Sequence, residues 1–164
     1  MSQYARRSAR VILLNAADRV LLLRSALAPP SQGHLWLTPG GAVEEGEDLS
    51  TAAARELHEE VGLAVAPGEL RPIAYSEGHV EFSWASGLFR DDFFLHRVHA
   101  HEVDTSGHTA LEQTHYRGFR WWSVGELQST TEDIFPYGLE MLLKRVMSGD
   151  VPAVPVRLPW GLRK

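Results

Sequence analysis

The 164-residue sequence contains no cysteine, and this absence removes three kinds of chemistry. Without a thiol, the chain forms no disulfide, supplies no thiolate nucleophile and binds no zinc through sulfur. A reducing compartment is compatible with such a sequence, and we expect the protein in the cytoplasm.

The sequence also lacks long apolar runs and a surplus of basic residues. The first apolar run, Val11 to Leu14, is far too short for a membrane span or for the core of a signal peptide. With 16 Lys and Arg against 21 Asp and Glu, the net charge is −5, and the short basic cluster of Arg6, Arg7 and Arg10 does not reverse it. We therefore expect neither membrane association nor stable, nonspecific binding of nucleic acid.

What the sequence does contain suits one compact domain. Its residues are 44% hydrophobic and 23% charged, with no internal repeat, no low-complexity tract and no linker long enough to separate two domains. A chain of this size buries roughly 70% of its unfolded surface. We expect a single domain over residues 1–164, with a proline-rich, extended tail from about residue 150.

The order of the predicted elements mixes strands and helices. Strands are predicted at residues 10–14, 20–24, 35–38, 70–76, 93–100 and 116–122, the first two forming a hairpin. Helices are predicted at residues 49–61, 124–128 and 136–147. This order predicts the α/β class, with a mixed β-sheet covered by helices on both faces as an α/β/α sandwich. The tail is expected to pack across this domain or against a second subunit.

Three carboxylates are spaced so that one turn of a helix brings them together. They lie in the segment Arg55-Glu-Leu-His-Glu-Glu-Val-Gly-Leu63. On a helix over residues 49–61, Glu56, Glu59 and Glu60 stand at i, i+3 and i+4 and project from one face. Their mutual repulsion costs roughly 0.2 to 0.5 kcal/mol per pair, and a divalent cation turns that repulsion into binding. Oxygen ligands favour Mg²⁺ or Mn²⁺ over zinc.

The wider segment from Gly41 to Leu63 reads G-x5-E-x7-R-E-U-x-E-E-x-G-U, where U is an aliphatic residue. Every fixed position of this pattern, which is the signature of the Nudix hydrolases, is met, and the chain resembles that family. A random match at one start position has odds on the order of one in a billion. A charged, solvated helix face would explain the glutamates, but not the joint placement of Gly41, Glu47, Arg55 and Gly62.

The resemblance implies a Nudix-type α/β/α sandwich that hydrolyses a pyrophosphate bond with Mg²⁺, or with Mn²⁺ as a substitute. It extends more weakly to Trp36–Gly41 before the motif and to Arg120–Leu127 after it. The implied partner is a small molecule, a nucleoside diphosphate linked to another moiety X. The sequence leaves open whether X makes a nucleoside triphosphate, a nucleotide sugar, ADP-ribose or a dinucleotide, and whether the protein is a homodimer.

By the same resemblance, the metal is held by Glu56, Glu59 and Glu60. A backbone carbonyl of Gly41 or of its neighbour Gly40 is expected to complete the coordination shell. Outside the metal site, Glu47 and Arg55 match positions whose usual role is a supporting ion pair that orients the ligand-bearing helix.

The general base has two candidates, because members of the family take it from the motif or from a carboxylate in a downstream loop. Within the motif, Glu59 and Glu60 are expected to be catalytic, and Glu60 is the candidate base. Glu112, just ahead of the strand predicted at residues 116–122, is the other candidate, as base or metal ligand. The alternative is that Glu112 and the nearby His115 belong to a solvated loop.

The tryptophans include candidates for stacking a nucleobase, although this residue more often packs in a core. The candidates are Trp36, Trp84, Trp121 and Trp122. If residues 116–122 form a strand, Trp121 and Trp122 point to opposite faces, so at most one of them contacts the ligand. The eight histidines do not indicate a zinc site, since the motif supplies oxygen ligands.

Two other function classes share this fold. The first is a noncatalytic module that binds or senses a nucleotide, and the intact glutamates argue against it. The second is isopentenyl-diphosphate isomerase, which uses a cysteine that this sequence lacks.

Overall fold

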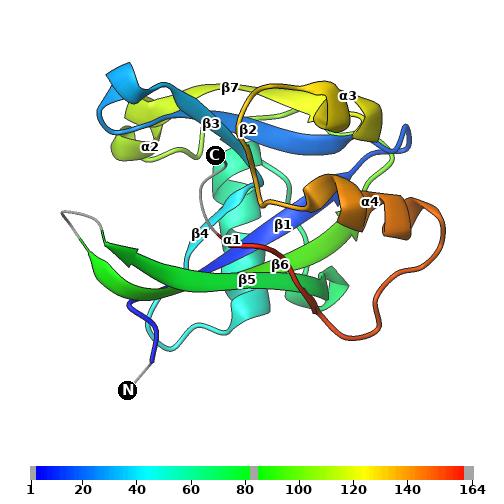
Figure 1. The fold of residues 1–164 in the computed structure, drawn as a ribbon, viewed down its shortest axis with the longest axis horizontal. Coiled ribbons are helices and arrows are strands. Elements are labelled where there is room, and N and C mark those ends of the chain that lie inside the picture. The colour runs from blue at the N-terminus through cyan, green and yellow to red at the C-terminus, as the bar shows by residue number, and fades with distance from the viewer. Residues whose placement is uncertain (1–2, 82–84, 161–164) are drawn as a thin grey trace.

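A mixed, nine-stranded sheet forms the centre of the molecule in a computed structural model that describes residues 3–81 and 85–160 (Figure 1). Its strands are β1 (Arg6–Leu14), β2 (Val20–Ala26), β3 (His34–Leu37), β4 (Gly40–Ala42), β5 (Arg71–Glu81), β6 (Ser86–Arg97), β7 (Tyr116–Trp122), β8 (Ile134–Phe135) and β9 (Val156–Arg157). The main path is β8-β3-β2-β1-β6-β5-β9, with β4 paired to β1 and β7 to β2. The pairs β1–β6, β3–β8 and β5–β9 are parallel and the others antiparallel.

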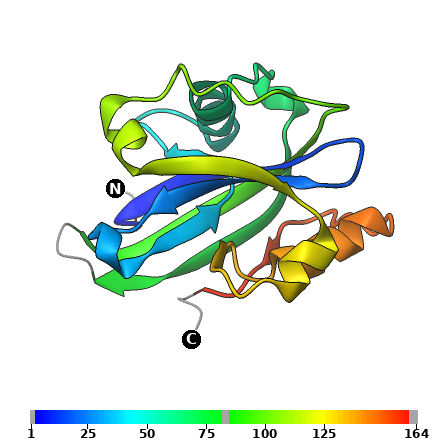
Figure 2. The same cartoon turned by 90° about the horizontal axis from the view of Figure 1, so that it is seen from above.

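Helices cover both faces of this sheet (Figure 2). They are α1 (Leu49–Val61), α2 (Ala110–His115), α3 (Val124–Ser129) and α4 (Leu139–Met147), with 3-10 turns at Pro30–Gln32 and Pro67–Glu69. α1 packs on one face, and α3 and α4 lie on the other. The prediction of an α/β fold with a mixed sheet between helices is confirmed. Among the described residues, no helix has the length and apolar character needed to cross a membrane.

β1 contributes to both hydrophobic cores because its side chains alternate. Val11 and Leu13 belong to the core beneath α1, whereas Ile12 and Leu14 belong to the core beneath α4. All four side chains are fully buried. One central strand therefore ties the two helical layers together.

The edge of β1 opposite β6 places the glycine-rich segment against α1. β1 meets β2 at Leu14↔Val20, while its first half pairs instead with β4, from Ser8↔Ala42 to Arg10↔Gly40. The insertion of β4 carries the backbone after Pro39 to the helix that bears the glutamates.

α1 covers the residues predicted from the sequence, and its two ends explain why. Asp48 accepts a hydrogen bond from the Thr51 amide at 2.9 Å, which caps the N-terminus. Gly62 has φ 75°, in the left-handed region, and its amide donates to the His58 carbonyl at 3.0 Å. A glycine is suited to this position, because a Cβ there would also come within 2.7 Å of the Cβ of Asp104.

The proline-rich tail is extended and lies along β5 (Figure 1). β9 pairs with β5 at Ala74↔Val156 and Tyr75↔Arg157. Beyond β9, the Leu158 amide donates to the Tyr75 carbonyl at 2.8 Å, and the Leu158 side chain is buried in the core beneath α4. The tail thus adds an edge strand to the sheet.

Candidate metal and catalytic site

Carboxylates from two helices converge on one point. Ligand oxygens of Glu56 and Glu60 on α1 and of Glu112 on α2 lie within 4.8 Å of one another. These hard oxygen donors repel one another unless a proton or a cation lies between them, and their chemistry fits Mg²⁺ or Mn²⁺. The structure therefore brings Glu56 and Glu60 of the motif together with Glu112, the downstream glutamate whose role the sequence left open.

Glu60 has the most strongly shifted pKa in this group. Its carboxylate accepts a hydrogen bond from the Gly40 amide at 3.0 Å. Burial raises the pKa of Glu60 to about 8, against the opposing effects of the Gly40 hydrogen bond and the charge of Arg10. The negative charges of Glu56 and Glu112 raise this pKa further. A buried carboxylate in this setting calls for a compensating positive charge, which is what a metal ion supplies.

Burial and a neighbouring charge also shift the pKa of Glu56 in opposite directions. Burial raises its pKa, although Arg55 donates a hydrogen bond to Glu56 Oε1 at 3.0 Å and opposes the shift. The backbone of Gly41 passes directly beside this carboxylate, and a Cβ at that position would lie 2.7 Å from Glu56 Oε1. Any larger residue at this position would therefore displace the Glu56 carboxylate.

Arg55 connects the loop before α1 to the carboxylates on it. Its guanidinium binds Glu47 through two parallel hydrogen bonds, Nε to Oε2 at 2.8 Å and Nη2 to Oε1 at 2.9 Å. It also donates to the Ala42 carbonyl at 3.1 Å, to Glu56 at 3.0 Å and to Glu59 at 3.4 Å. The bond to Arg55 lowers the pKa of Glu47, and the bond to Glu47 raises that of Arg55. This bidentate pair fixes the entry into the helix.

Glu59 lies outside the three-carboxylate group. Its side chain is 36% exposed and contacts Arg55 instead. Glu112 is held by a capping box at the start of α2: its Oε1 accepts from the Thr109 amide, and its own amide donates to Thr109 Oγ1, each at 3.2 Å. His115, at the other end of α2, is not a member of the group.

Two arginines on β1, Arg6 and Arg10, lie near the acidic group, and neither was assigned a role in the site from the sequence. Arg10 is 12% exposed and donates to Asp91 Oδ1 at 2.9 Å and to the Thr38 carbonyl at 3.2 Å. Burial and the nearby charge of Arg10 lower the pKa of Arg6, whereas Asp91 and Glu56 raise it. The carboxylates are therefore flanked by cations that can meet phosphate oxygens.

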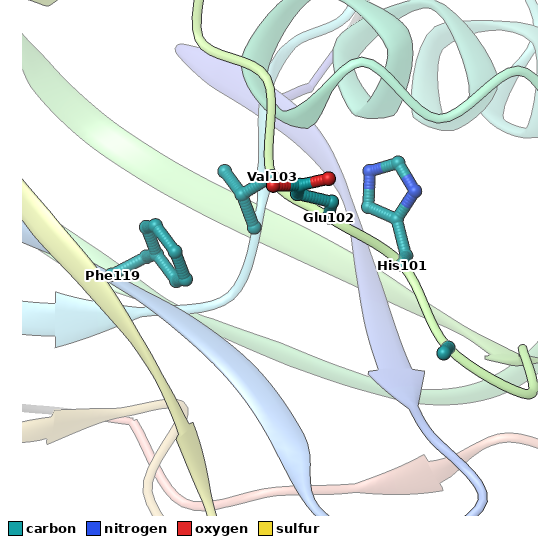
Figure 3. A pocket seen from close by; sticks show the side chains of 5 residues that line it. His101, Glu102, Val103 and Phe119 are labelled. Atoms are coloured by element: carbon teal, nitrogen blue, oxygen red, sulfur yellow. The ribbon is translucent and has the colours of Figure 1, made fainter.

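The segment after β6 packs on the C-terminal end of α1. The Nε2 atoms of His101 and His108 lie 2.7 Å from the Val61 carbonyl and 2.8 Å from the Glu60 carbonyl, and the Asp104 amide donates to Val61 at 3.0 Å. Figure 3 shows His101 pointing toward that helix. Nothing in the local sequence marks these histidines, because their partners are some 40 residues away along the chain.

Beside this segment lies a largely apolar hollow of about 440 Å³, in which Val103 and Phe119 face each other (Figure 3). Its other lining residues are Ala100, His101 and Glu102. None of the three clustered carboxylates lines it, so we do not take it for the site of chemistry.

The tryptophans named from the sequence mostly pack in the cores. Trp36 and Trp122 are buried and meet edge to face, with ring centroids 5.2 Å apart. Trp121 packs against the core beneath α1, so the prediction that it and Trp122 point to opposite faces is confirmed. Trp84 lies outside the described residues.

Comparisons with known proteins agree with this geometry. A family model for the NUDIX domain matches residues 5–141. The m7GpppN-mRNA hydrolase NUDT17 of Danio rerio is 43% identical over 60 residues, which are 37% of this chain and 20% of that protein. An RNA pyrophosphohydrolase of Caulobacter vibrioides is 29% identical over 140 residues, covering 77% of this chain and 75% of the relative.

Among solved structures, the NUDIX domain of Shewanella oneidensis NrtR complexed with ADP ribose matches 91% of this chain and 89% of its own, with a TM-score of 0.63 and 14% identity. At that identity the match shows the fold alone. The family match and the pyrophosphohydrolase relatives indicate a hydrolase that acts on pyrophosphate bonds. Because the family model spans most of the sequence, the chain belongs to the NUDIX family.

Proposed function

We propose that the protein hydrolyses the pyrophosphate linkage of a nucleoside diphosphate joined to another moiety X, with Mg²⁺ as cofactor and Mn²⁺ as a substitute. The observation that carries this proposal is the convergence of Glu56, Glu60 and Glu112 within 4.8 Å. In the proposal, these three side chains hold the metal. Glu59 and the carbonyl of Gly41 would supply further oxygen ligands.

When bound, the divalent cation supplies charge neutralisation and a more acidic water. The residues of the chain orient the reactants and move the proton. Arg6 and Arg10 of β1 lie near the carboxylates and would bind phosphate oxygens of the substrate. A carboxylate of the site, Glu60 or Glu112, takes the proton of the attacking water. Arg55, bound to Glu47, keeps α1 in register with the glycine-rich segment.

Several substrates of this class fit the same site. The chain is similar to an RNA pyrophosphohydrolase, and a neighbour in fold binds ADP ribose, so both a nucleoside triphosphate end and a nucleotide sugar belong in a screen. The protein is proposed to act as one domain over residues 1–164 in the cytoplasm, on a small molecule. Neither stable nucleic-acid binding nor a membrane partner forms part of the proposal.

A noncatalytic nucleotide-binding module is the second candidate. It draws support from the solved NrtR domain, which is complexed with ADP ribose. The intact carboxylate group argues for catalysis instead, because binding alone does not require buried, mutually repelling glutamates.

A screen for the phosphorylated products of hydrolysis, separated by chromatography, tests the proposal. The purified protein is incubated with Mg²⁺ or Mn²⁺ and nucleoside triphosphates, ADP-ribose, NADH, nucleotide sugars or dinucleotide polyphosphates, with Glu60→Gln as the control. Release by the wild type that is absent from the variant would support hydrolysis and name the substrate class. Tight nucleotide binding without release in any reaction would favour the binding module.

A further inference from the structure

Three partly exposed aromatic rings gather where the tail meets β8. The ring centroid of Phe135 lies 6.3 Å from that of Trp160 and 6.3 Å from that of Tyr137, both in edge-to-face geometry. Each of the three side chains keeps part of its surface in solvent. A cluster of half-exposed rings offers planar surfaces that can stack on a ligand.

Trp160 is held in this cluster by the backbone beneath it. The tail is anchored by β9 and by the buried Leu158, two residues before the tryptophan. The indole then packs on Gly78 of β5 so closely that a Cβ at residue 78 would overlap it. The glycine thus forms a cradle for the ring, and the backbone of β5 fixes the position of the indole.

Arg10 links the aromatic cluster to the acidic group. Its guanidinium carbon lies 5.7 Å from the Phe135 ring centroid, in cation–π geometry. The same side chain is fixed by Asp91 and the Thr38 carbonyl, and Arg10 pairs in the sheet with Gly40, whose amide donates to the Glu60 carboxylate at 3.0 Å. The carboxylates are thus followed by the cation of Arg10 and then by the aromatic rings. A nucleotide has the matching order, with phosphates that bind metal and cations at one end and a planar base at the other.

We propose that Trp160 is a specificity-determining residue that stacks on the nucleobase of the substrate. This inference rests on the proposed function and narrows its substrates to those that present an unpaired base. The family match ends at residue 141, so the tail that carries Trp160 lies outside the matched segment. Stacking on an aromatic side chain tolerates any base, so the contact selects for a base over none.

Binding of products gives a direct test that needs no turnover. In the presence of Mg²⁺, the dissociation constants of AMP, GMP, CMP and UMP are compared with that of ribose 5-phosphate, which lacks a base. We expect wild-type protein to bind at least one nucleotide tenfold or more tightly than ribose 5-phosphate, and Trp160→Ala to lose about tenfold of that preference. Affinity for ribose 5-phosphate should stay unchanged, and Trp160→Phe should recover part of the loss.

Matched controls separate stacking from an effect on the fold. Val154→Ala changes a 74% exposed residue of the same tail and should leave the preference as in wild type. Gly78→Ala keeps the tryptophan but displaces it from its cradle, and should reproduce the loss. Its control is Gly68→Ala, where a Cβ meets nothing within 4 Å. If Trp160→Ala does not fold, as judged by circular dichroism, Gly78→Ala decides.

The proposal is overturned if wild-type protein binds the nucleotides no better than ribose 5-phosphate. It is also overturned if folded Trp160→Ala retains the full preference, in which case the tryptophan only fastens the tail. Failure of the proposed function looks different: it leaves nucleotide binding measurable while no substrate in the hydrolysis screen is cleaved.

Discussion

At the residue scale, the site depends on carboxylates whose charge the fold keeps away from water. Glu60 is the clearest case, because among the described residues only the Gly40 amide donates a hydrogen bond to its carboxylate. Such a side chain costs stability unless a proton or a cation accompanies it. The burial of Glu60 is therefore an argument for function, since an exposed glutamate would serve α1 better if the helix were merely structural.

Replacing Glu60 by Gln should separate function from stability. The amide oxygen can still accept from the Gly40 amide, whereas the negative charge is lost. We expect turnover to fall by several orders of magnitude, on the order of 10³-fold, with the fold retained. The measurement is kcat together with Mg²⁺ affinity by calorimetry, and unchanged Mg²⁺-dependent turnover would contradict the metal assignment.

Glu59→Gln provides the comparison on the same helix. The resemblance places Glu59 among the metal ligands, but its carboxylate contacts Arg55 and lies outside the three-carboxylate group. We predict a large loss of kcat here as well, because metal binding would draw this side chain from Arg55 into the site. A loss below about threefold would instead identify Glu59 as a partner of Arg55 alone.

Glu112→Gln asks whether the downstream glutamate acts in chemistry. The capping box at Thr109 survives the change, since an amide oxygen still accepts from the Thr109 amide. We expect kcat to drop at least about 100-fold while thermal stability stays near that of wild type. Thr109→Ala is the matched control for the cap; if it lowers kcat as much as Glu112→Gln does, the role of Glu112 is to shape the loop.

At the scale of elements, the decisive contact is between β4 and α1. The motif glycine at residue 41 is the point where the strand backbone meets the Glu56 carboxylate. Gly41→Ala should push Glu56 aside and weaken Mg²⁺ binding about tenfold or more, with little change in helix content. Calorimetric titration with Mg²⁺ checks this, and Gly68→Ala is the control at an open position. Equal affinities in the two variants would contradict the steric role.

The sequence predicted some elements well because their signals are local. α1 has a capping aspartate, an apolar face and a terminal glycine, all within its own segment. The β5–β6 hairpin extends further than predicted, to Glu81 and from Ser86, because its outer half pairs charged residues such as Glu77 and Arg90 rather than alternating apolar ones. Pro136 does not start α4, which begins at Leu139.

The same distinction applies to the site. The motif glutamates could be identified from their spacing alone, whereas the roles of Arg10, His108 and Trp160 depend on partners far away in the sequence. Glu112 could be identified only in part. Its position before β7 made it a candidate, but the packing of the segment after β6 is what brings it to α1.

At the scale of the whole molecule, metal binding and folding are coupled through the acidic group. Any ligand that binds only the folded state adds to its stability, by about 2.7 kcal/mol at a concentration 100 times its dissociation constant. In the absence of metal, the proton on Glu60 replaces the cation. The stability of the protein should therefore depend on pH in opposite ways with and without Mg²⁺.

Burial raises the pKa of Glu60 from 4.5 to about 8 in the folded, metal-free protein. Between these values the folded state holds a proton that the unfolded state releases, so the free energy of unfolding should fall as pH rises from about 4.5 to about 8. Thermal unfolding in EDTA measures this, and Mg²⁺ should restore most stability at the alkaline end. Glu60→Gln isolates the contribution of Glu60, because the free energy of unfolding of this variant should fall less with rising pH than that of wild type. An equal fall in both proteins would show that groups other than Glu60 cause it.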